Sequence, residues 1–146
     1  MGTDPFRLRR FVEAQGQREY ESILEELRSG QKYGHWMWYV FPQIQGLGWS
    51  AMSQRYAISG QEEARAYVEH ATLGSRLREC TQLVIALDGR RAEQIFPYPD
   101  NLKFCSCMTL FAETSTDPGI FRIALNKYFH GESDPLTLDI LRKKEG

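Results

Sequence analysis

The amino-acid sequence predicts an all-α fold, arranged as a single compact domain of about seven to nine helices over residues 1–146. Asp-Pro pairs occur at positions 4–5, 117–118 and 134–135, each ahead of apolar residues at helical spacing. Asp is a preferred N-cap and Pro suits the first helical position, so each pair predicts a helix start. Along most of the chain, apolar residues recur three and four positions apart, which is the period of a helix with one buried face.

The first thirty residues predict two helices. From Pro5 an apolar stripe continues through Leu8 and Phe11, and Gly16 interrupts it. The second stripe consists of Tyr20, Ile23, Leu24 and Leu27. It ends at Gly30, which suits the left-handed C-cap conformation.

Residues 35–41 fit a buried helix or a buried strand, because six consecutive aromatic, β-branched or sulfur side chains show no period that separates the two. A helix is favoured, since no second strand is available to pair with the segment. Ser50 is a candidate N-cap for a further helix that contains Met52 and Arg55.

The later helices are predicted from their caps. Ser59-Gly60-Gln61-Glu62 has the pattern of a capping box, and the helix that it opens ends near His70. Thr72 is the expected start of the next helix, which ends at Asp88-Gly89. Further helices are expected at residues 92–96, 100–113, 118–131 and from 135 into the charged tail.

Charge and cysteine content exclude several classes of protein. Eighteen basic side chains balance nineteen acidic ones with no run of like charge, so neither nucleic acid nor a membrane is expected as a partner. The N-terminus lacks a signal-peptide pattern and the longest nearly apolar run, residues 36–41, is too short to span a bilayer, which predicts a cytoplasmic protein. Cys105-x-Cys107 suggests a metal site, but thiols two positions apart on a helix point away from each other. Buried thiols are therefore favoured, and no metal or cofactor is expected.

The most unusual stretch extends from His35 to Ser50. Five aromatic rings fall within fourteen residues, at positions 36, 38, 39, 41 and 49. They form a core, or one or two of them line a pocket in which Trp38 stacks on a planar ligand and Gln43 orients it by hydrogen bonds. His35 is the candidate acid or base beside them, although a lone histidine also fits a structural role.

A loop with two glycines follows this aromatic segment. Gly46 and Gly48 lead to Ser50, and such a loop ahead of a helix can present backbone amides to an anion. A Gly-x-Gly pair before a helix equally fits a simple turn with positive φ.

The segment 100–113 is apolar almost all round, so we expect it to lie centrally. Its polar residues form one narrow stripe, which consists of Lys103, Ser106, Thr109 and Glu113. If the stripe faces solvent, Lys103 is an ordinary surface lysine. If it faces a cleft against residues 35–50, Lys103 and Ser106 can hold a carboxylate or phosphate, and this is the best cationic site in the sequence.

Several segments resemble one uncharacterised bacterial family of all-helical proteins, sometimes labelled "calpastatin-like". They are residues 35–43, 46–48, 56–58, 102–104 and 108–111. The resemblance covers nearly the whole chain and implies a compact helical domain without an established activity. We set the label aside, because calpastatin is disordered and repetitive whereas this chain is neither. A fainter similarity, in size and helical character, links the chain to the NADAR family of ADP-ribose-processing glycosidases, but the acidic segment ending in Trp-Gly is missing.

Two hypotheses follow. The first is a pocket for a small anionic or nucleotide-like ligand. If the protein is an enzyme, the expected reaction is hydrolysis of a glycosidic bond or transfer of a phosphoryl group, with His35 as the acid or base. The residues expected to bind the ligand are Trp38, Gln43, Gly46, Gly48, Ser50, Tyr56, Lys103 and Ser106. The alternative is a non-catalytic protein-interaction module with an exposed aromatic patch. The sequence sets no oligomeric state.

Overall fold

The structure, a computed structural model, describes residues 3–145 and builds them into ten helices. They are α1 (Arg9–Ala14), α2 (Gln17–Ser29), α3 (Met37–Val40), α4 (Ala51–Arg55), α5 (Gln61–Glu69), α6 (Ala71–Ala86), α7 (Ala92–Ile95), α8 (Asp100–Thr114), α9 (Gly119–Phe129) and α10 (Pro135–Glu145). The same residues contain no strand, only an isolated parallel bridge between Ile44 and Ile58. The predicted all-α class is confirmed. The ten helices exceed the expected seven to nine by one, and α3, α4 and α7 have only four or five residues each.

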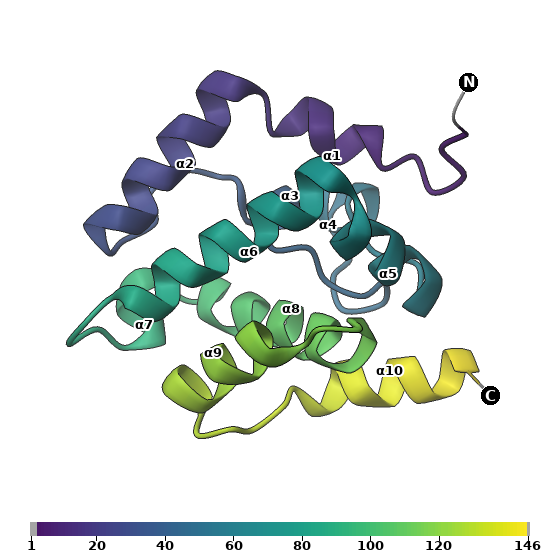
Figure 1. The fold of residues 1–146 in the computed structure, drawn as a ribbon. Helices are drawn as coiled ribbons and strands as arrows, with labels where there is room; N and C mark the ends of the chain where they lie inside the picture. Colours follow the sequence, from purple (N-terminus) through teal and green to yellow (C-terminus); the bar gives the residue numbers. More distant parts are fainter. Residues whose placement is uncertain (1–2, 146) are drawn as a thin grey trace.

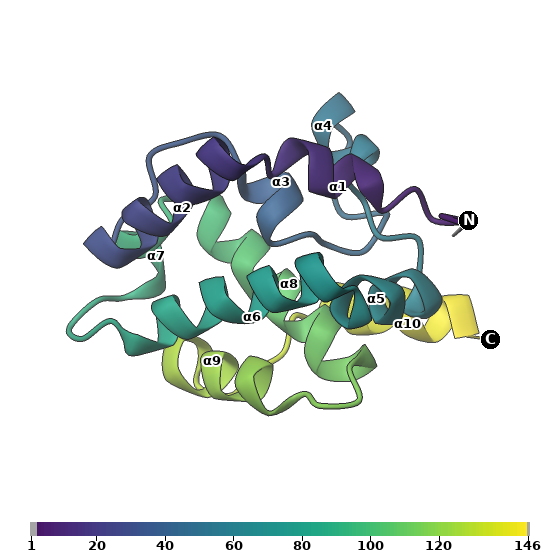
Figure 2. The same ribbon diagram turned by 45° about the horizontal axis from the view of Figure 1, so that its top comes forward.

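Helices α6 and α8 occupy the middle of the molecule (Figure 1). Helix α6 packs against α2, α5 and α9, while α8 packs against α5, α9 and α10. Both views place α1 and α2 on one side of this pair and α9 on the other (Figure 2), and α10 follows α9 along the lower side of Figure 1. Most of α8 is buried, in agreement with its apolar composition. Within residues 3–145, no helix is long and apolar enough to cross a membrane.

The aromatic segment 35–41 forms the short helix α3, so the favoured helical interpretation is confirmed. The Trp36 side chain is buried, and its indole Nε1 donates a hydrogen bond of 3.1 Å to Oε1 of Glu26 in α2. The ring of Phe41 packs edge-on against those of Phe96 and Phe104, with centroid separations of 5.6 and 5.1 Å. Most of the segment therefore belongs to the hydrophobic core.

The Asp-Pro pairs lie at or near helix starts. Asp134 caps α10, where its Oδ2 accepts the backbone N–H of Thr137 at 3.3 Å, and α9 starts directly after its pair. Asp4 accepts two backbone N–H groups of the N-terminal turn, but α1 begins only at Arg9. The delay arises at Arg7, whose φ of +51° interrupts the helical turn.

Two other caps differ from the prediction. Helix α5 begins one residue later than the capping box predicts, with Gly60 as its N-cap, and Glu63 rather than Glu62 accepts the backbone N–H of Ser59, at 2.9 Å. Helix α6 is capped by His70, whose Nδ1 accepts the backbone N–H of Thr72 at 3.1 Å. His70 thus satisfies free N–H groups at the start of α6, whereas Glu63 binds the residue that precedes the N-cap of α5.

The loop between α3 and α5 carries α4 and is closed by backbone pairing. The N–H of Gln45 donates to the carbonyl of Ile58 at 2.8 Å, and the N–H of Ile58 donates to the carbonyl of Gln43 at 2.9 Å. These two hydrogen bonds hold the beginning and the end of the loop together, and α4 lies in the part of the loop between them.

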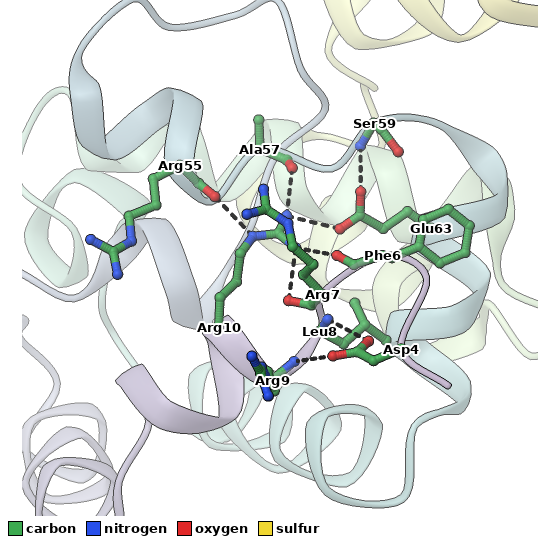
Figure 3. A network of polar contacts seen from close by, with 10 residues as sticks. All are labelled: Asp4, Phe6, Arg7, Leu8, Arg9, Arg10, Arg55, Ala57, Ser59 and Glu63. Carbon is green, nitrogen blue, oxygen red and sulfur yellow. Dashed lines mark hydrogen bonds and ion pairs between the residues drawn. The ribbon is translucent and has the colours of Figure 1, made fainter. Parts of the chain in front are cut away.

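Arg10 joins α1 to this loop and to α5 (Figure 3). Its guanidinium donates to the carbonyl oxygens of Arg55 and Ala57 at 2.8 and 2.9 Å and pairs with Glu63 at 2.9 Å. The exposed fractions of the Arg10 and Glu63 side chains are 13% and 4%. A largely buried ion pair thus holds the end of α4 and the residues that follow it.

Candidate functional site

A cavity of about 610 Å³ lies beside the N-terminal half of α8, and we call it the α8 pocket. Its walls come from Trp38 and residues 43–48, 53–54 and 56–57, from Pro99 and residues 102, 103, 105 and 106 around the start of α8, and from the segment 128–136 that joins α9 to α10. Small-molecule sites in proteins usually enclose about 300–1,000 Å³. The α8 pocket is therefore large enough for a metabolite of nucleotide size.

The structure brings together seven of the nine residues proposed from the sequence. Those lining the α8 pocket are Trp38, Gln43, Gly46, Gly48, Tyr56, Lys103 and Ser106. The ring-rich stretch and the polar stripe of the helix at 100–113 thus meet at one cavity. Lys103 lies in the wall of this cleft, rather than on the open surface of the molecule.

His35 and Ser50 lie outside the α8 pocket. His35 is exposed, because the neighbouring Trp36 side chain turns into the core toward α2 and leaves the histidine on the surface. The Ser50 hydroxyl oxygen is engaged as the N-cap of α4, where it accepts the N–H of Ser53 at 3.0 Å. Geometry therefore gives neither residue direct access to a molecule in the pocket.

Lys103 belongs to a small charged cluster at the start of α8. Its Nζ lies 5.0 Å from the centroid of the Trp38 ring and 3.5 Å from Oδ1 of Asp100. The other oxygen of Asp100 pairs with the buried Lys32 at 2.6 Å. Lys32 also interacts with the carboxylate of Glu26, so Lys103, whose side chain is 25% exposed, is the cation of the cluster that faces the pocket.

Ser106 is engaged with the protein rather than free. Its hydroxyl lies 2.8 Å from Oδ2 of Asp134 and 3.1 Å from the carbonyl oxygen of Leu102, and its single proton serves these acceptors. Asp134 also accepts from the hydroxyl of Thr137 at 2.6 Å, and its own N–H donates to Thr109 at 2.9 Å. Ser106 and Thr109 therefore tie α8 to the start of α10 and shape the floor of the pocket.

The segment 128–136 forms a wall that sequence reasoning missed. It contributes Phe129, Glu132 and Leu136, and it turns at His130 and Gly131, whose φ values of +56° and +77° end α9. The glycine at this helix end was visible in the sequence, but nothing in the local pattern indicated that the turn faces α8. The packing of both α9 and α10 against α8 decides that orientation.

Titratable groups in the pocket are sparse. Burial, and then the negative charge of Asp134, raise the pKa of the Cys105 thiol to about 11. Burial likewise raises the pKa of Tyr128, whose hydroxyl donates to the carbonyl of Val84. The Cys105 thiol is therefore almost wholly protonated at neutral pH, which makes it a poor nucleophile. Among residues 3–145, no group of three or more His, Cys, Asp or Glu side chains is placed to hold a metal ion.

Together, the fold and the pocket define a small all-helical protein with a ligand-sized cavity lined largely by apolar side chains. The chain belongs to the family described as "Protein of unknown function (DUF1810)", whose sequence profile matches residues 5–141. It is similar to the crystal structure of the conserved hypothetical protein Rv1873 from Mycobacterium tuberculosis, with 52% sequence identity and a TM-score of 0.93. That similarity covers 95% of this chain and 99% of the other. No curated protein matches the chain.

Proposed function

We propose that the α8 pocket binds a small anionic or nucleotide-like ligand. The observation that carries this proposal is the position of Lys103, a partly exposed cation in the wall of a cavity of about 610 Å³ beside the Trp38 ring. The amide of Gln43 adds a group on the same wall that can both donate and accept hydrogen bonds. A mostly apolar cavity with a few convergent polar groups is the usual form of a small-molecule site.

The proposal is one of binding and assigns no reaction. The acid or base expected from the sequence, His35, lies outside the pocket, so hydrolysis of a glycosidic or phosphoryl bond lacks its proposed proton carrier. The thiol in the wall, Cys105, has a raised pKa and does not suit nucleophilic attack. The geometry supports recognition better than turnover.

A thermal-shift screen with nucleoside monophosphates, ADP and ADP-ribose tests this function. A ligand at one hundred times its Kd stabilises the native state by about 2.7 kcal/mol. In a chain of this size the midpoint of unfolding should then rise by roughly 5–11 °C. Binding in the α8 pocket should also slow alkylation of Cys105, which lines it, whereas the other two cysteines are buried elsewhere in the core. A shift without protection of Cys105 would place the ligand at another site, and no shift across anionic ligands would count against the function.

The exposure of Trp49 favours a second candidate, a non-catalytic protein-interaction module. Its side chain is 83% exposed, whereas Trp36 is buried and Trp38 half-buried. Fully exposed tryptophan is uncommon in proteins and frequent at interfaces. A photo-crosslinking residue at position 49 should give a specific adduct with one partner that the same residue at the exposed Arg9 does not. Equal labelling from both positions would contradict this candidate.

A further inference from the structure

Lys103 is the charged hydrogen-bond donor that the α8 pocket offers to an acidic ligand. The ammonium of Lys103 has three N–H donors, and Asp100, at 3.5 Å, is its ion-pair partner among residues 3–145. The indole N–H of Trp38 is shielded from water and has no hydrogen-bond partner within the described part of the chain. Because this N–H is shielded from water, an acceptor in the pocket does not reach it, and Lys103 is the donor that a ligand meets.

The charges along the α8 pocket favour a ligand with a single negative charge. Lys32 interacts with the carboxylates of both Asp100 and Glu26, so Lys103 is the cation of the cluster that a bound anion meets. Elsewhere the lining residues carry the opposite sign, since Glu132 and Asp134 both belong to the wall. A polyphosphate would place its further charges in a cavity whose remaining ionised groups are carboxylates, and like charges brought together in a partly desolvated site repel strongly.

The ring of Trp38 is not a free stacking platform. The ammonium of Lys103 already lies over it, 5.0 Å from the ring centroid. The apolar part of a ligand therefore has to lie along other walls of the pocket. Leu102 and Leu136 line it and remain 53% and 64% exposed, so a ligand that covers them removes apolar surface from water.

Resting on the proposed function, we infer that the ligand class of the α8 pocket is an organic monocarboxylate with an apolar body. Its carboxylate accepts hydrogen bonds from Lys103, and its body covers Leu102, Phe129 and Leu136. Charge-assisted hydrogen bonds of this kind correspond to about 10- to 100-fold in affinity. The inference separates this class from nucleotides, which carry phosphates and a base for stacking.

Isothermal titration calorimetry with 2-naphthoate, its neutral isostere 2-naphthamide, and ADP tests this inference. The unmodified protein should bind the acid at least tenfold more tightly than the amide and more tightly than ADP. In Lys103→Met the preference for the acid over the amide should disappear. The matched control, Lys143→Met, removes an exposed lysine of α10 that pairs with Asp139 and does not line the pocket, and it should keep the full preference.

Each alternative outcome has a definite meaning. Equal binding of acid and amide, or an acid preference that survives in Lys103→Met, overturns the inference. Tighter binding of ADP than of 2-naphthoate also overturns it, while it supports the proposed function. If none of the three probes binds and the nucleotide screen is negative as well, both proposals fail. The acid-to-amide ratio of the unmodified protein decides the matter even if Lys103→Met does not fold.

Discussion

Replacing Arg10 by methionine tests how the loop that carries α4 is held in place. The substitution removes the guanidinium that pairs with Glu63 at 2.9 Å and donates to the carbonyls of Arg55 and Ala57 (Figure 3). It leaves the Glu63 carboxylate, only 4% exposed, with the Ser59 N–H as its remaining hydrogen-bond donor in the described chain. Removing one partner of a buried ion pair costs about 3–5 kcal/mol, because the remaining charge stays buried without compensation.

The expected loss is large enough to measure in a simple denaturation experiment. Urea unfolding of Arg10→Met, followed by circular dichroism, should show a free energy of unfolding lower by about 3–5 kcal/mol. The midpoint of thermal unfolding should fall by roughly 10 °C in a chain of this size. Because Arg9 is exposed and its side chain makes no hydrogen bond in the described chain, Arg9→Met is the matched control and should unfold within about 0.5 kcal/mol of the parent.

A double-mutant cycle separates the ion pair from simple loss of packing. Glu63→Gln removes the buried charge, so Arg10→Met combined with Glu63→Gln should cost less than the two single changes together, by about 1–3 kcal/mol. Additive effects would show that the pair contributes no interaction energy of its own. A loss below about 1 kcal/mol in Arg10→Met would refute the reasoning from burial.

Three further predictions follow from other sites. Gly74→Ala should prevent stable folding, because the added Cβ would lie 2.0 Å from the backbone oxygen of Val68. In Gly119→Ala the added Cβ has no atom within 4 Å, so thermal unfolding followed by circular dichroism should show unchanged or slightly higher stability. Alkylation of Cys105 by iodoacetamide, followed by mass spectrometry, should accelerate about tenfold from pH 8 to pH 9. The reason is that the thiolate fraction of a group with a pKa of about 11 still rises in this range, and a plateau there would contradict the raised pKa. His70→Ala should lower the free energy of unfolding by about 1 kcal/mol. His70→Asn can also cap α6 and should retain most of the stability that His70→Ala loses, so equal losses in both variants would contradict the capping role.

The helices were largely predictable from local chemistry. Gly30 takes the left-handed C-cap conformation expected of it, with a φ of +90°, and Asp134 caps the last helix as its Asp-Pro pair predicts. The central position of α8 followed from a composition that leaves little room for a solvent-facing side. The capping partner of Ser59 was not predictable from the pattern, because its N–H binds Glu63, one residue beyond the Glu62 that a capping box requires.

The candidate site was predictable where it depends on helical periodicity and not where it depends on tertiary packing. The spacing of Lys103 and Ser106 placed both on one face of α8, and both line the pocket. The orientation of His35 depends instead on Trp36, which turns into the core to reach Glu26. The wall at 128–136 depends on how α9 and α10 fold back on α8, and no local pattern in the sequence encodes that packing.

A crystal structure of the complex with 2-naphthoate is the measurement that tests the central claim most directly. The account predicts the naphthyl group against Leu102 and Leu136 at the mouth of the α8 pocket. A carboxylate oxygen should lie about 3 Å from Nζ of Lys103. A naphthyl group stacked on Trp38 with its carboxylate in solvent, or density only at another surface of the molecule, would contradict it.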